Sequence, residues 1–114
     1  MRECLADDAV ICDRRALGIM VEIGRDQWID SLRALADLAP DAAIEVFRIL
    51  AWNRHGRVSL SRVYGSMKDA GPFENVFVGV YLTDRERIQR YEFFDVGDTD
   101  RALARFEELC ASLP

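Results

Sequence analysis

The sequence has few of the residues on which disulfide frameworks, metal centres and histidine-based catalysis depend. Its three cysteines, Cys4, Cys12 and Cys110, are an odd number without Cys-x-x-Cys spacing. That usage is typical of reduced thiols in the cytoplasm and argues against a disulfide framework or a zinc site. His55 is the sole histidine and lies in a polar segment, so a histidine-dependent triad has almost no support. Glycine-rich phosphate loops are also absent, and the sequence predicts neither a metal nor a cofactor.

Long apolar runs and clusters of positive charge are missing as well. No apolar stretch approaches the ~20 residues of a membrane-spanning helix, and residues 1–8 lack the apolar centre of a signal peptide. The formal net charge is -5 and the arginines are spread along the chain, so we expect no nucleic-acid partner and no membrane contact. The chain has 114 residues, 50% of them hydrophobic and 31% charged, which suits one cytoplasmic domain with a single core.

Two segments have the apolar period of amphipathic helices. In residues 25–38, apolar side chains recur at the i, i+3, i+4 spacing of a helix face, and Pro40 follows as a stop signal. Either Gly24 or Asp26 is expected to cap this helix. A second helix is predicted over residues 100–113.

From Ala43 onward the apolar period changes to two, which is typical of β-strands. Strands are expected at residues 44–51, 58–64, 73–82 and 88–94, separated by polar turns. A short strand at residues 10–13 precedes the first helix, and residues 18–24 are expected to form an apolar loop. This order predicts an α+β fold, in which both helices cover one face of a curved, mostly antiparallel sheet.

The last third of the chain and three shorter motifs resemble a known family. Residues 73–109 run through two strands into Glu-Phe-Phe-Asp (92–95) and an amphipathic helix. The stretches at 7–15, 24–26 and 50–53 fall where that family has its first strand, its middle helix and the start of its sheet. In this order they resemble a SnoaL-like domain of the nuclear-transport-factor-2-like, or ketosteroid-isomerase-like, superfamily. The resemblance implies a cone-shaped, cystatin-like roll, on a scaffold that carries both enzymes and binding domains.

SnoaL-like domains usually begin with helices that this sequence lacks. We therefore interpret residues 1–114 as a single, N-terminally short SnoaL-like domain: a trimmed chain, a module of a longer one or a reduced homologue. Without these helices, apolar surface of the sheet would be exposed to water. Association with a second copy of the chain is the simplest way to bury it. We predict a homodimer whose interface centres on Phe77, Tyr81, Tyr91 or Phe93, since aromatic residues concentrate at interface cores.

Asp13 is the candidate catalytic residue. It ends the first strand at the position where, by the resemblance, ketosteroid isomerases have their proton-transferring aspartate. A carboxylate base needs an apolar pocket that raises its pKa toward the working pH. Arg14 and Arg15 follow directly, however, and either could pair with Asp13 and keep it a poor base. We predict that Asp13→Asn leaves folding intact and reduces ligand binding or any turnover.

Six further residues are candidates for ligand contacts: Trp28, Trp52, Arg62, Tyr64, Asn75 and Glu92. The tryptophans offer flat apolar surface, although aromatic residues at such spacings also simply build cores. Arg62 and Glu92, with Tyr64, could orient a polar ligand, or could face each other as a cross-strand ion pair. By the resemblance, Asn75 lies near the cavity-lining strand.

These observations together predict a small-molecule-binding SnoaL-like domain, non-catalytic or sensory, that holds an apolar or aromatic ligand in a cone-shaped pocket. Two alternatives remain open. One is a ketosteroid-isomerase-like or polyketide-cyclase-like proton-transfer enzyme that uses Asp13. The other is a dimerisation or assembly module.

Overall fold

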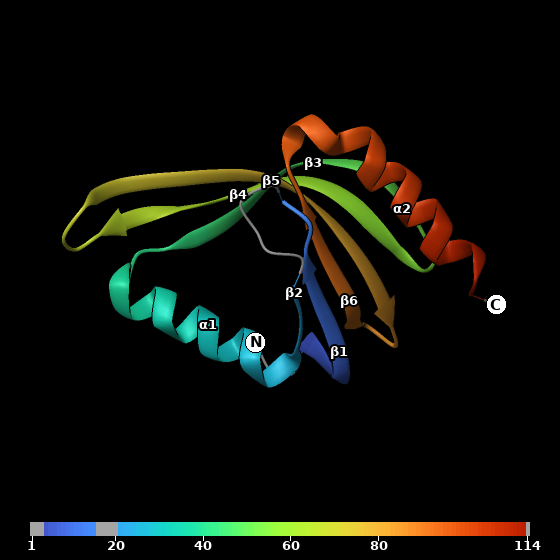
Figure 1. Ribbon diagram of the computed structural model, residues 1–114, viewed down its shortest axis with the longest axis horizontal. Coiled ribbons are helices and arrows are strands. Elements are labelled where there is room, and N and C mark those ends of the chain that lie inside the picture. The colour runs from blue at the N-terminus through green and yellow to red at the C-terminus, as the bar shows by residue number, and fades with distance from the viewer. Residues whose placement is uncertain (1–3, 16–20, 114) are drawn as a thin grey trace.

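A computed structural model describes residues 4–15 and 21–113 of the chain (Figure 1). Its elements, in chain order, are β1 (Leu5–Asp13), β2 (Val21–Gly24), α1 (Arg25–Leu38), β3 (Ala43–Asn53), β4 (Gly56–Met67), β5 (Gly71–Asp84), β6 (Arg87–Phe94), the short 3-10 helix η2 (Val96–Asp98) and α2 (Thr99–Ala111). In this part of the chain, no helix is long and apolar enough to cross a membrane. The predicted α+β class is confirmed.

One curved, open sheet contains all these strands in the order β2-β1-β6-β5-β4-β3. The four strands from β3 to β6 form the predicted antiparallel meander. The pairing of β1 with β6 is parallel, which makes the sheet mixed. β1 begins at Leu5, five residues before the expected strand. Residues 21–24 are not loop but form β2, antiparallel to β1, whereas the rest of that expected loop, residues 18–20, lies outside the described residues.

Both α-helices form close to where the apolar period places them. α1 has the predicted bounds: it begins after Gly24 and ends at Leu38, and the N–H of its C-cap, Ala39, donates to the carbonyl of Leu35. Pro40 then prevents the helix from continuing. α2 begins one residue before the predicted start and ends two residues before the predicted end, a difference of the usual size for helix ends.

The helices lie on opposite faces of the sheet, so the expectation that they share one face is wrong. Figure 1 shows α1 inside the curve of the sheet and α2 on its outer side. The central strands explain the arrangement, because residues 77–82 of β5 are all buried and their side chains alternate between the two faces. Phe77 and Tyr81 belong to the core cluster with Ile29 of α1. Val78 and Val80 pack with Phe106 of α2.

This arrangement corrects the predicted dimer interface. Phe77, Tyr81, Tyr91 and Phe93 are only 2–7% exposed and pack within the chain on the α1 side. They cannot form the centre of an interface with another copy. The large apolar side chains that are exposed lie mainly on the edge strand β3: Ile44, Val46, Phe47, Ile49 and Trp52.

Candidate ligand-binding site

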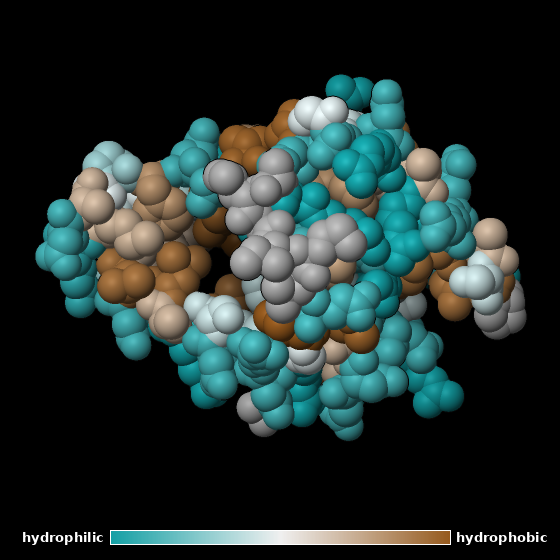
Figure 2. Space-filling view, in the orientation of Figure 1, coloured by the Kyte–Doolittle hydropathy of each residue, from teal (hydrophilic) through white to brown (hydrophobic). Residues whose placement is uncertain are grey.

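A pocket of about 490 Å³ lies between α1 and the inner face of the sheet. Figure 2 shows brown, apolar atoms bordering a hollow on this side of the molecule. Its described lining is mostly apolar: Trp28, Leu32, Leu35, Ala36, Ala42, Ala43, Ile44, Val63, Phe77, Tyr91 and Phe93, with Arg15, Ser31 and Asn75 as the polar members. Apolar walls with a few polar groups, at about 300–1,000 Å³, are typical of small-molecule sites.

Four aromatic rings form one wall of this pocket. The centroid of Trp28 lies 5.3 Å from that of Phe93, and Phe77 meets Phe93 edge-on, also at 5.3 Å. Tyr91 lies 4.2 Å from Phe93 in a tilted arrangement. Such pairs stabilise one another by about 0.5–1.5 kcal/mol beyond the area they bury. Contacts among the four rings therefore fix the positions of these side chains, so the aromatic wall is formed without a ligand.

Tyr91 is joined to Tyr81 by a buried hydrogen bond, in which the Tyr81 hydroxyl donates to the Tyr91 hydroxyl over 2.6 Å. Burial, reinforced by the neighbouring Tyr81, raises the pKa of Tyr91 well above its ordinary value. Gly79 leaves room for both rings, because a Cβ there would lie 3.0 Å from Tyr91 and 3.1 Å from Tyr81. Because its pKa is raised, Tyr91 stays a neutral hydroxyl at physiological pH.

Arg15 is the one charged side chain among the described residues that line the pocket. Its Nε and Nη2 donate to the two carboxylate oxygens of Asp13 at 2.9 and 2.7 Å. The backbone N–H of Arg15 adds a third hydrogen bond, 3.0 Å from Oδ1. The guanidinium carbon also lies 5.3 Å from the ring centroid of Phe93. Arg15 thus places a guanidinium, ion-paired with Asp13, in a lining whose other described residues are uncharged.

Asp13 serves as the partner of that arginine. Burial alone would raise the pKa of the Asp13 carboxyl, but the hydrogen bonds and charge of Arg15 outweigh it and lower the pKa below its ordinary value. A carboxylate held in this form is a poor general base near neutral pH. Asp13 is also not among the described residues that border the pocket. Of the two arginines that could have paired with it, the partner is Arg15.

The structure brings two of the six candidate ligand-contact residues to this pocket, Trp28 and Asn75. Trp52 is 78% exposed on β3 and borders a separate hollow. Arg62 and Tyr64 border a more open hollow at the far end of the β4–β5 hairpin.

Arg62 and Glu92 do not face each other, so the interpretation that joined them is wrong. Arg62 stacks 4.2 Å from the ring centroid of Tyr64 and forms ion pairs with Glu74 at 2.6 Å and Glu45 at 3.2 Å. It is therefore a cross-strand ion-pair residue, since Glu45 and Glu74 lie on the strands to either side. Strand β5 lies between Arg62 and Glu92, and Arg62 pairs with Val76 of β5 whereas Glu92 pairs with Val80.

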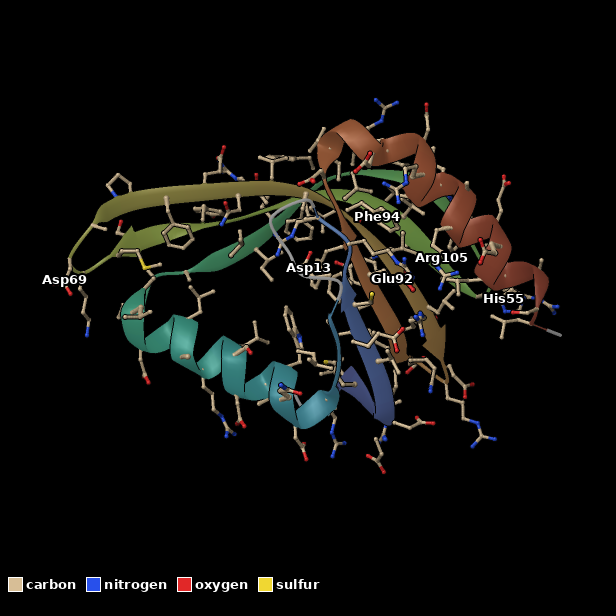
Figure 3. All side chains as sticks on the ribbon, viewed as in Figure 1. Asp13, His55, Asp69, Glu92, Phe94 and Arg105 are labelled. Carbon is tan, nitrogen blue, oxygen red and sulfur yellow. The ribbon has the colours of Figure 1, made fainter. Side chains whose placement is uncertain are left out.

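Glu92 lies fully buried on the α2 side of the sheet. Figure 3 shows it near Arg105 of α2, whose Nε and Nη2 donate to the carboxylate at 3.0 and 3.2 Å. Arg14 donates to the same carboxylate at 2.7 Å, and Arg90 donates to it as well. Burial would raise the pKa of Glu92, but the hydrogen bonds from these arginines lower it overall. Glu92 is thus an ionised residue of β6 that joins α2 to Arg14, the residue directly after β1, rather than a ligand contact.

Sequence reasoning did not single out Arg15 as a pocket residue or Arg14 and Arg105 as partners of Glu92. A signal existed for Arg15, because residues two apart in an extended chain point to the same side. For Arg105 there was none, because its contact with Glu92 depends on which face of the sheet α2 covers. In the described ranges, 4–15 and 21–113, no group of three His, Cys, Asp or Glu side chains could hold a metal ion.

Comparison with solved structures identifies the fold. IdmH from Streptomyces antibioticus, a proposed polyketide cyclase, superposes with a TM-score of 0.68 at 19% identity, covering 90% of this chain and 84% of its own. A phenazine biosynthesis-related protein from Pseudomonas aeruginosa gives 0.64 at 19% identity, covering 90% of this chain and 68% of its own. A Catenulispora acidiphila protein with a ketosteroid isomerase-like fold gives 0.63 at 16% identity, covering 83% and 72%.

The chain therefore has the nuclear-transport-factor-2-like, SnoaL-like fold. Identities below 25% support the architecture alone. No protein-family model matches the sequence. No curated protein matches it either.

Proposed function

We propose that this protein binds an apolar, aromatic small molecule between α1 and the inner face of the sheet, as a non-catalytic or sensory domain. The observation that carries the proposal is the aromatic wall of Trp28, Phe77, Tyr91 and Phe93 around a hollow of about 490 Å³. Flat rings facing an apolar cavity favour a flat apolar ligand, because its burial releases water from both surfaces.

The alternative of a proton-transfer enzyme has support in the fold, since IdmH is described as a proposed polyketide cyclase. Asp13 is the residue on which that alternative depended. Its bidentate contact with Arg15 and its lowered pKa favour a binding role for this site over proton abstraction. A turnover assay on Asp13→Asn addresses the enzyme hypothesis directly, because a general base cannot be replaced by an amide.

Binding is measurable with the neutral dye N-phenyl-1-naphthylamine, which accepts excitation energy from tryptophan. The chain has two tryptophans, Trp28 in the pocket wall and Trp52 on β3. Trp52→Phe leaves Trp28 as the sole donor, so energy transfer in this variant reports a dye close to the pocket. We expect saturable binding with efficient transfer from Trp28.

A matched pair of variants on α1 locates the dye. Ala36 borders the pocket, whereas Ala34 is an exposed residue of the same helix that does not. Ala36→Phe should fill part of the hollow and weaken dye binding severalfold, while Ala34→Phe should leave it unchanged. If the dye fails to bind, or if both substitutions act alike, the proposed pocket is not the binding site.

We also propose that a second copy covers the exposed apolar residues of β3. The residues Ile44, Ile49 and Trp52 are 52%, 42% and 78% exposed on this edge strand. Several exposed apolar side chains on one edge strand commonly mark an interface. Sedimentation at micromolar concentration should give twice the 13.0 kDa mass of one chain, and Trp52→Lys should shift the population toward the monomer. A wild-type mass near one chain contradicts the dimer.

A further inference from the structure

The ligand pocket has a charge asymmetry that bears on what it accepts. Of the described residues that line it, Arg15 is charged, Ser31 and Asn75 are neutral and polar, and none is a carboxylate. An arginine beside an apolar wall is costly unless its donors are satisfied. Asp13 satisfies part of this need by engaging Nε and Nη2.

Within the described residues, some donors of Arg15 have no hydrogen-bond partner. A guanidinium has five N–H groups, of which two belong to Nη1. Among the described residues, no acceptor forms a hydrogen bond with Nη1 of Arg15. The fork with Asp13 fixes the plane of the guanidinium beside the Phe93 ring. A side chain held this way loses less conformational entropy when it forms a new hydrogen bond than a mobile surface arginine does.

From this we infer that the pocket takes an aromatic acid, with its rings on the wall of Trp28 and Phe93 and its anionic group on Nη1 of Arg15. The inference rests on the proposed binding function and specifies its ligand class. Arginine matches the planar, two-oxygen shape of a carboxylate or the oxygens of a sulfonate. In this arrangement Asp13 is a positioning residue, which orients Arg15 and does not touch the ligand.

Two dyes that share the same rings separate the apolar part of binding from the anionic part. N-phenyl-1-naphthylamine is neutral, whereas 8-anilino-1-naphthalenesulfonate carries a sulfonate on the same skeleton. Arg15→Gln removes the positive charge from the pocket. Arg33→Gln makes the same chemical change on α1, at a side chain that is 71% exposed and does not border the pocket.

We expect Arg15→Gln to weaken binding of the sulfonate dye about tenfold, the effect of losing one charge-assisted hydrogen bond of moderate strength. The neutral dye should bind this variant with less than about a twofold change, which also shows that the pocket is intact. Arg33→Gln should change neither affinity. Arg15→Lys keeps the charge and should recover part of the loss for the sulfonate dye.

A measurement on the wild-type protein gives an independent check. Added salt should weaken binding of the sulfonate dye and leave the neutral dye unaffected, because salt screens the attraction between the two charges. If neither dye binds, the proposed function itself fails. If the neutral dye binds at the pocket but Arg15→Gln affects both dyes equally, or neither, the ligand is not recognised as an acid and this inference alone is overturned.

Discussion

Replacing Glu92 by glutamine should destabilise the protein strongly, although the two side chains have nearly the same shape. Glu92 is 0% exposed, and its carboxylate accepts hydrogen bonds from Arg14, Arg90 and Arg105. Glutamine removes the negative charge and turns one acceptor into an N–H donor, which then faces arginine donors. The substitution therefore leaves the three arginines without the carboxylate that balances their positive charge.

The size of the effect follows from burial. Removing one partner of a buried ion pair typically costs about 3–5 kcal/mol. The three arginines are each 20–21% exposed and can regain some water, so we expect about 3 kcal/mol, the lower end of that range. With a urea m-value of roughly 2 kcal/mol/M, the unfolding midpoint should fall by about 1.5 M.

The assay is urea unfolding followed by circular dichroism, with Glu74→Gln as the matched control. Glu74 also pairs with an arginine, Arg62, but its side chain is 50% exposed, so its loss should cost less than about 1 kcal/mol. If Glu92→Gln is no more destabilising than Glu74→Gln, the buried ion-pair network does not contribute as we reason.

The pH dependence gives a second test of the same residue. The pKa of Glu92 is lowered in the folded state from an ordinary value of 4.5, so folding favours the ionised form. Its contribution to stability is complete above the unfolded pKa and is lost as the pH falls through the folded pKa. The stability difference between wild type and Glu92→Gln should be constant near neutral pH and should shrink below about pH 4.5. A difference that grows on acidification would refute the assignment.

The remaining predictions concern backbone packing and the pocket charge pair. Gly56→Ala should cost about 3 kcal/mol in urea unfolding, because its Cβ would lie 1.8 Å from the backbone oxygen of Tyr81. Gly97→Ala, with nothing within 4 Å of its Cβ, should be neutral or slightly stabilising, and equal effects at the two sites would contradict this reading. A double-mutant cycle with Asp13→Asn and Arg15→Gln should give a coupling of about 1 kcal/mol in the free energy of unfolding, modest because the side chains are 27% and 33% exposed. Additive effects would mean that the pair is not formed in solution.

Local patterns in the sequence were enough to predict the elements that depend on local interactions. α1 has the bounds that its apolar stripe and Pro40 indicate, because a helix satisfies its backbone within its own segment. The antiparallel meander from β3 to β6 also follows from period-two alternation and the polar turns between neighbouring strands.

Tertiary structure decided what depends on partners distant in the chain. Whether residues 21–24 are loop or strand depends on their pairing with β1, and the parallel contact of β1 with β6 joins segments some 80 positions apart. A strand with two apolar faces does not encode which helix covers which face. That choice places Glu92 under α2, whereas the parallel pairing of β1 with β6 brings Arg15 beside Phe93 in the pocket. The sequence alone thus determined both helices and the antiparallel meander, while β2 and the site arose from packing, since their residues meet partners that lie far away in the chain.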